Sequence, residues 1–196
     1  MEYTKIPTTT FQKLQINAGI ICTEFEPSTG VATGQIGATT GGAKFSATPS
    51  FKDFGDDVDN CPKKTKEMMQ IEDWDVALSG SLITVDAATA KMLIAACDID
   101  GTDSNKLVPR NNLKSTDFED LWLIGDYSDK NENGTNKTAG YVAIKVINAL
   151  NEGGFQLETA DKSKGKFAFN FVGHYSMDAQ DTVPFEVYVK AGTVTP

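Results

Sequence analysis

The segment AKFSATPSF, residues 43–51, decides the fold, because apolar and polar residues alternate along it and the segment DWDVALSGSLITV, residues 73–85, repeats the alternation. Successive side chains of a β-strand point to opposite faces, so each segment is expected to form a strand with one apolar and one polar face. The apolar positions of the first strand are Phe45, Ala47, Pro49 and Phe51. Two such strands in succession predict the arms of an antiparallel hairpin.

A stretch of about twenty residues separates these strands, whereas hairpin loops usually contain about two to five. The many charges of this stretch are typical of a solvated surface loop. Its apolar residues, which include Met68 and Met69, instead favour an arm that packs on a neighbouring subunit. We interpret residues 52–70 as such an inter-subunit loop. Its contact residues are predicted to be Lys52, Asp53, Phe54, Asp56, Asp57, Cys61, Met68 and Met69.

The rest of the chain predicts further strands around one helix. Asp86 is a favourable N-cap for the alanine-rich residues 87–96, which predict a helix packed flat against a sheet. Turn signals separate the other predicted strands, which are residues 14–25, 118–127, 140–150, 155–160, 166–175 and 183–190. The expected fold is therefore mainly β: an antiparallel β-sandwich or partial barrel of about eight strands with one flanking α-helix and a long hairpin loop. The 196 residues fit a single domain, with residues 1–11 as an N-terminal leader.

Charge and cysteine content argue against several classes of protein. A formal net charge of −9 does not attract a phosphate backbone, so an ordinary nucleic-acid-binding protein is not expected. The three cysteines are odd in number and lack C-x-x-C spacing, which predicts neither a disulfide framework nor a zinc site. The polar N-terminus lacks the apolar core of a signal peptide, and no stretch approaches about 18 apolar residues. We therefore expect a protein made in the cytoplasm, with no membrane partner.

The sequence offers no convincing catalytic, metal or cofactor site. His174, the only histidine, is expected within a strand, and no nucleophile elbow or Cys-His pattern lies near it. The glycine-rich segment GQIGATTGG lacks the Gly-Lys-Ser/Thr ending of a phosphate loop. Asp129, Asn131 and Asn133 match the start of a calcium loop, but Gly140 stands where its last ligand belongs, so a plain turn is preferred. We expect no enzymatic activity and no cofactor.

Four stretches resemble the major tail tube proteins of long-tailed bacteriophages, the siphophage major tail protein family. They are GATTGGAKFSATPSFKDFGDDVDNCPK, LWLIGDYSDKN, YVAIKVINALNEGGFQL and GHYSMDAQDTVPFEVYV. The likeness extends from about residue 15 to residue 192 and rests on extent and order, because no catalytic motif contributes to it.

The resemblance implies a structural virion protein, made in the host bacterial cytoplasm, that assembles as hexameric rings stacked into the tail tube. It implies a small β-sandwich with one flanking helix. It also implies that DNA passes through the tube during ejection without specific binding. The tape measure protein and the tail terminator or distal tail proteins would be the other partners.

In such a tube, polar strand faces would line the lumen. Four strands from each of six subunits, about 4.8 Å apart, give a circumference of about 115 Å and a diameter of about 37 Å before strand tilt widens it. So wide a lining must be solvated, and acidic or small side chains would let DNA slide. The predicted lumen-facing residues are Lys44, Ser46, Thr48, Ser50, Asp73, Asp75, Ser79, Ser81, Gln156, Glu158, Lys166 and Asn170.

Two other classes of protein compete with this interpretation. A β-sandwich adhesin or pilus-like structural module would be expected to carry a secretion or sorting signal. A β-sandwich hydrolase would need polar residues that converge on a pocket. Electron microscopy separates the classes, because rings or tubes favour the tail tube and a strict monomer at high concentration favours the others.

Overall fold

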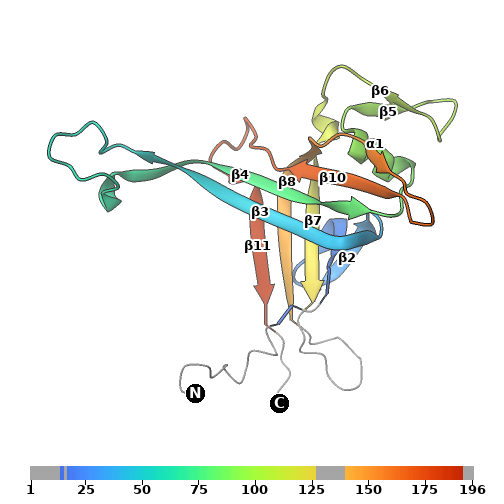
Figure 1. The fold of residues 1–196 in the computed structure, drawn as a ribbon, viewed down its shortest axis with the longest axis horizontal. Helices are drawn as coiled ribbons and strands as arrows, with labels where there is room; N and C mark the ends of the chain where they lie inside the picture. The colour runs from blue at the N-terminus through green and yellow to red at the C-terminus, as the bar shows by residue number, and fades with distance from the viewer. Residues whose placement is uncertain (1–13, 16, 127–139, 192–196) are drawn as a thin grey trace, which may run out of the picture.

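The structure is a computed structural model that describes residues 14–15, 17–126 and 140–191 (Figure 1). Within these residues the protein is mainly β, as predicted, with a single α-helix. The elements in chain order are β1 (Ile20–Glu26), β2 (Val31–Gln35), β3 (Thr39–Asp53), the 3₁₀ turn Lys66–Met68, β4 (Met69–Leu82), α1 (Ala87–Ile94), β5 (Cys97–Ile99), β6 (Leu107–Pro109), the 3₁₀ turn Ser115–Asp117, β7 (Glu119–Asp126), β8 (Tyr141–Asn151), β9 (Gln156–Glu158), β10 (Lys166–Val172) and β11 (Phe185–Lys190).

Nine of the strands form one antiparallel arrangement that folds into two layers. Sheet 1 contains β2, β1, β7, β8 and β11, and sheet 2 contains β3, β4, β10 and β9, each in order of pairing. Leu150 and Asn151 at the end of β8 pair with β10 and so join the layers. Figure 1 shows sheet 2 running across the upper part of sheet 1. The architecture is consistent with the predicted sandwich or partial barrel.

The core lies where the two sheets cross. Leu121 and Val146 of sheet 1 are fully buried in one cluster with Leu78 and Phe171 of sheet 2. The apolar positions of the alternating strands therefore point inward, as the period of two predicts. Burial of a side chain of this size stabilises the fold by about 1.5–3 kcal/mol.

Helix α1 closes one end of the sandwich. Asp86 caps it, because its carboxylate accepts a 2.8 Å hydrogen bond from the backbone N–H of Thr89. The helix ends at Ile94, two residues earlier than predicted, because Ala95 has a positive φ of 68°. Its carbonyl at Leu93 accepts a 2.6 Å bond from the buried side chain of Asn151, which connects the helix to the junction between the sheets.

Several predicted boundaries were wrong. The first strand begins at Ile20, not at residue 14, and β2 was not predicted. The β5–β6 hairpin, in which Asp98 pairs with Val108, lies in a segment that the sequence predicted as a loop. Its strands are only three residues long, too short to show an alternation. The calcium candidates Asp129, Asn131 and Asn133 lie outside the described residues.

In the part of the chain that the structure describes, no helix has both the length and the apolar character needed to cross a bilayer.

Candidate assembly surfaces

The four strands predicted to line a lumen lie side by side in sheet 2. Lys44 of β3 and Asn170 of β10 are both paired with Ser79 of β4, so these three side chains point to the same face. Lys166 is likewise paired with Glu158 across β10 and β9. Following this register places all the predicted lumen residues on one side of sheet 2, which we call the polar face: Lys44, Ser46, Thr48, Ser50, Asp73, Asp75, Ser79, Ser81, Gln156, Glu158, Lys166 and Asn170.

The polar face is more mixed in charge than the expected acidic lining. Lys44 and Lys166 offset much of the charge of its carboxylates, and Lys166 stands directly opposite Glu158. Thr48 and Asp75, which pair with each other, are exposed, whereas Ser79 near the middle of the sheet is half-buried. The face is therefore hydrophilic, with only a slight excess of negative charge.

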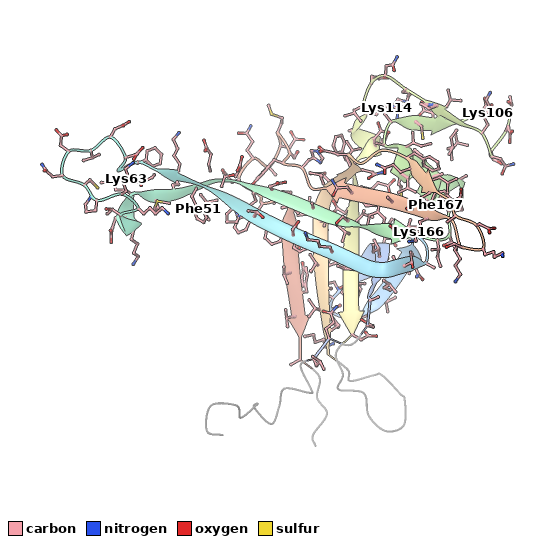
Figure 2. The ribbon with its side chains drawn as sticks, in the orientation of Figure 1. Phe51, Lys63, Lys106, Lys114, Lys166 and Phe167 are labelled. Atoms are coloured by element: carbon pink, nitrogen blue, oxygen red, sulfur yellow. The ribbon has the colours of Figure 1, made fainter. Side chains whose placement is uncertain are left out.

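Strands β3 and β4 continue well beyond the sandwich. Their last pair is Asp53 with Met69, and the N–H of Phe54 then donates a 3.0 Å bond to the carbonyl of Met68. The predicted loop boundaries of 52 and 70 are therefore too wide, because the connecting loop is residues 54–68. Figures 1 and 2 show this hairpin projecting from one side of the molecule, with Phe51 and Lys63 along it. We call residues 51–71 the arm.

A change of register marks the point where the arm leaves the sandwich. Ser50 pairs with Asp73, but the next pair is Phe51 with Ile71, so β4 carries one extra residue there. Beyond this bulge apolar side chains are exposed: Phe51 is 61% exposed and Phe54 is 52% exposed. The other exposed apolar residues of the arm are Val58, Met68 and Ile71. Such a concentration is typical of a protein interaction site.

The loop at the end of the arm is held by its own hydrogen bonds. Each carboxylate oxygen of Asp53 accepts a 2.8 Å bond, one from the N–H of Lys64 and one from that of Gly55. These bonds hold the pKa of Asp53 below its usual range. Cys61 and Met69 are half-buried, whereas the remaining predicted contact residues except Asp53 are exposed: Lys52, Phe54, Asp56, Asp57 and Met68.

The structure places His174 differently from the prediction. Strand β10 ends at Val172, so His174 lies in the segment after it, not within a strand. Its Nδ1 lies 3.1 Å from the carbonyl oxygen of Asn148, and its Nε2 lies 3.2 Å from a carboxylate oxygen of Glu152. Both ring nitrogens are thus directed at oxygen acceptors.

A shallow pocket of about 450 Å³ adjoins this histidine. Its lining residues are Ser115, Phe118, Asn148, His174, Tyr175, Ser176 and Met177. Elsewhere in residues 14–15, 17–126 and 140–191, no group of three or more His, Cys, Asp or Glu residues is arranged to hold a metal ion.

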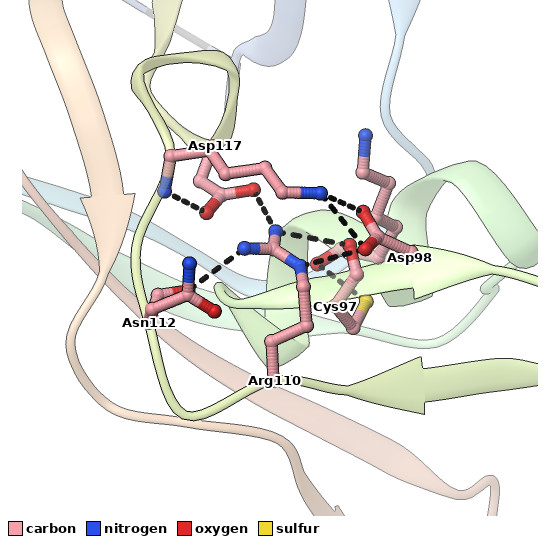
Figure 3. A network of polar contacts seen from close by, with 7 residues as sticks. Cys97, Asp98, Arg110, Asn112 and Asp117 are labelled. Atoms are coloured by element: carbon pink, nitrogen blue, oxygen red, sulfur yellow. Dashed lines mark hydrogen bonds and ion pairs between the residues drawn. The ribbon is translucent and has the colours of Figure 1, made fainter.

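A buried polar network fixes the β5–β6 hairpin (Figure 3). The guanidinium of Arg110 donates to Asp117, whose carboxylate is fully buried, and to the backbone carbonyls of Cys97 and Asn112. Its Nε lies 3.0 Å from Asp98, but not in hydrogen-bonding geometry. Lys114 adds a second cation, 2.9 Å from Asp98.

The charges in this network shift the pKa values of its carboxyl groups. Burial raises the pKa of Asp117, but the N–H of Lys114 and the Arg110 guanidinium together bring it below its usual value. The hydrogen bond from Lys114, followed by the charge of Arg110, lowers the pKa of Asp98. Both carboxyl groups are therefore ionised at neutral pH and hold the short hairpin in place.

No protein-family model matches the chain, and a search of curated proteins finds no match.

Proposed function

We propose that this protein is the structural subunit of a bacteriophage tail tube, which polymerises as stacked hexameric rings and conducts DNA into the host. One observation carries the proposal: sheet 2 is divided along four adjacent strands into a polar face and an opposite face that is part of the core. A sheet of this kind can form the wall of a water-filled channel, because its polar face tolerates solvent and the apolar face of β3, β4 and β10 packs into the core.

The free edges of sheet 2 support ring formation. Strand β3 lies at one edge and β9 at the other, and neighbouring strands alternate in direction. Because the number of strands is even, a copy added head to tail brings its β9 antiparallel to β3, and the pairing continues without interruption. Closure of such a ring removes both edges, which would otherwise promote uncontrolled association. Six copies give a channel of about 37 Å before tilt widens it.

The arm supports the stacking of rings. Strands of a closed barrel run along its wall with a tilt of about 35–45° from the axis. The arm continues the direction of β3 and β4 beyond the sandwich, so it would leave its own ring and reach the adjacent one. Its exposed Phe51 and Phe54 would then be buried in the contact between rings.

Electron microscopy and sedimentation of the purified protein test this proposal. Rings or tubes with an open channel are expected, and a strict monomer at high concentration would contradict the proposal. Accessibility then tests the lining. In a Cys61→Ser background, Thr48→Cys should react with a bulky maleimide in the monomer but slowly in tubes.

A matched control is Ser104→Cys, which lies on an exposed loop away from the polar face and should react rapidly in both states. Rapid labelling of Thr48→Cys in intact tubes would place the polar face on the exterior and overturn the proposed lining.

A further inference from the structure

Sheet 1 is longer than the layer that covers it. In Figure 1, β7, β8 and β11 continue past β3, which is the edge strand of sheet 2. The register shows which side chains face sheet 2 along these strands. Phe185 pairs with Val146, and both contribute to the core between the sheets. The pairs Val187 with Ile144 and Val189 with Val142 follow at intervals of two residues, so they lie on the same side. We call Val142, Ile144, Val187 and Val189 the overhang.

The overhang is apolar, and its two β11 valines are poorly covered, whereas Val142 and Ile144 are half-buried. Val187 is 51% exposed and Val189 is 64% exposed, although both share the inward side of β11 with Phe185. Among the described residues, none of the four overhang side chains packs against either buried cluster. The charged residues of β11, Glu186 and Lys190, alternate with the valines and lie on the other side of the strand. The overhang is therefore an uncharged sheet face in need of a cover.

The opposite edge of sheet 2 carries a second apolar surface. Leu157 of β9 pairs with Phe167, and the ring of Phe155 packs 5.8 Å from that of Phe167. Phe155 and Leu157 lie on the same side of sheet 2 as the buried Phe169, yet they are 45% and 53% exposed. Figure 2 shows Phe167 at the end of the sheet away from the arm. We call Phe155 and Leu157 the β9 patch.

We infer that the overhang of one subunit covers the β9 patch of the next subunit in a ring. The partner is thus a second copy of this chain, and the inference rests on the proposed function. A copy that joins the free edge of β3 through its own β9 enters the space beside β3 into which the overhang extends. The overhang faces the layer between the two sheets, and the β9 patch lies on the side of sheet 2 that faces the same layer. Edge pairing of β9 with β3 therefore turns the two surfaces toward each other.

The chemistry of the two surfaces agrees with this contact. Both consist of uncharged aliphatic or aromatic side chains. Their contact removes apolar surface from water and desolvates no charged group. Each subunit carries one of each surface, so a head-to-tail ring leaves no surface unpaired after closure. The contact extends the sandwich core from one subunit into the next, outside the channel wall.

A disulfide cross-link tests the contact directly. In a Cys61→Ser background that is first shown to assemble like the wild type, Val189→Cys combined with Leu157→Cys should give a ladder of covalent oligomers after mild oxidation of assembled protein, ending at the closed ring. Either cysteine alone should give no ladder. The control pair, Val31→Cys with Leu157→Cys, uses an exposed valine of β2 and should also give none. Absence of the ladder from protein that forms tubes, or a cross-link within a single chain, would overturn the inference.

A charge substitution provides an independent measurement. Val189→Glu should remain folded by circular dichroism and raise the protein concentration needed for assembly at least tenfold, whereas Val31→Glu should assemble like the wild type. Normal assembly of Val189→Glu would show that another segment of the same chain covers the overhang, and would overturn the inference. Failure of the unsubstituted protein to form rings or tubes would count against the proposed function itself, so the two failures are distinguishable.

Discussion

The backbone N–H of Trp74 donates a 2.9 Å hydrogen bond to the phenol oxygen of Tyr175. Trp74 lies just beyond the point where β4 stops pairing with β10. The last backbone bond there runs from the N–H of Gly173 to the carbonyl of Val76. Tyr175 therefore replaces a strand neighbour at the base of the arm. The arm is anchored to the segment that follows β10 by a side chain, not by a continued ladder of backbone bonds.

Removing this hydroxyl should loosen the base of the arm. Tyr175→Phe deletes the acceptor of the Trp74 N–H and is expected to lower the free energy of unfolding by about 0.5–1.5 kcal/mol. Hydrogen exchange at the Trp74 amide should become faster. Tyr188→Phe is the matched control, because it deletes a hydroxyl bonded only to the exposed Glu186 side chain and should change stability little. Unchanged exchange at Trp74 would show that Tyr175 does not anchor the arm.

Shortening the arm should separate folding from assembly. Residues 55–67 can be replaced by Asn-Gly, which forms a two-residue hairpin turn between Phe54 and Met68, the last residues joined by a backbone bond. The core lies far along the strands from this turn, so circular dichroism and thermal stability should be retained. We expect a folded protein that forms no tubes in the electron microscope, and tubes of normal length would contradict a stacking role for the arm.

The polar network under the β5–β6 hairpin should contribute stability that depends on pH. Asp117→Asn removes the buried charge that pairs with Arg110 and should lower the unfolding midpoint by at least about 3 °C at pH 7, since about 1 kcal/mol corresponds to about 2–4 °C in a domain of this size. Asp178→Asn, at an exposed site, should leave the midpoint unchanged.

The sign of the pH effect follows from the lowered pKa values of Asp117 and Asp98. A lowered folded-state pKa gives stability that is fully present above the unfolded pKa of about 3.9 and is lost as pH falls through the folded value. The difference in midpoint between wild type and Asp117→Asn should therefore be constant from about pH 7 to pH 5 and shrink below about pH 4. A difference that grows in acid would contradict this account.

Reversing charges on the polar face should slow DNA without preventing assembly. Asp75→Lys with Glu158→Lys changes two exposed side chains of the polar face and leaves the core untouched. Tubes should form, but fixed cations along the channel would attract phosphates and delay ejection of DNA from particles built with the variant. Asp103→Lys with Asp178→Lys changes the net charge equally at exposed sites outside sheet 2 and should not affect ejection. Equal ejection rates for both variants would argue against a channel lined by this face.

Alternation within segments allowed the sequence to predict the sheet faces and much of the fold class. The polar and apolar sides of β3, β4 and β10 follow from the period of two alone, because a one-residue slip would expose residues such as Phe45 and Phe169. Asp86 and the alanine-rich segment after it likewise indicated the helix, since capping is a local interaction.

Tertiary structure decided everything that depends on contacts between distant segments. The order β3, β4, β10, β9 joins residues that are far apart in the sequence, and only this order makes the predicted polar residues one surface. Strand β5 and the segment after β10 make side-chain contacts that no periodicity reveals, such as Arg110 with Asp98 and His174 with Glu152. The overhang also exists only because sheet 2 crosses part of sheet 1. Local alternation determines which side of a strand is apolar. Only the packing of the two layers determines how much of that apolar side stays exposed and can be covered by a neighbouring subunit.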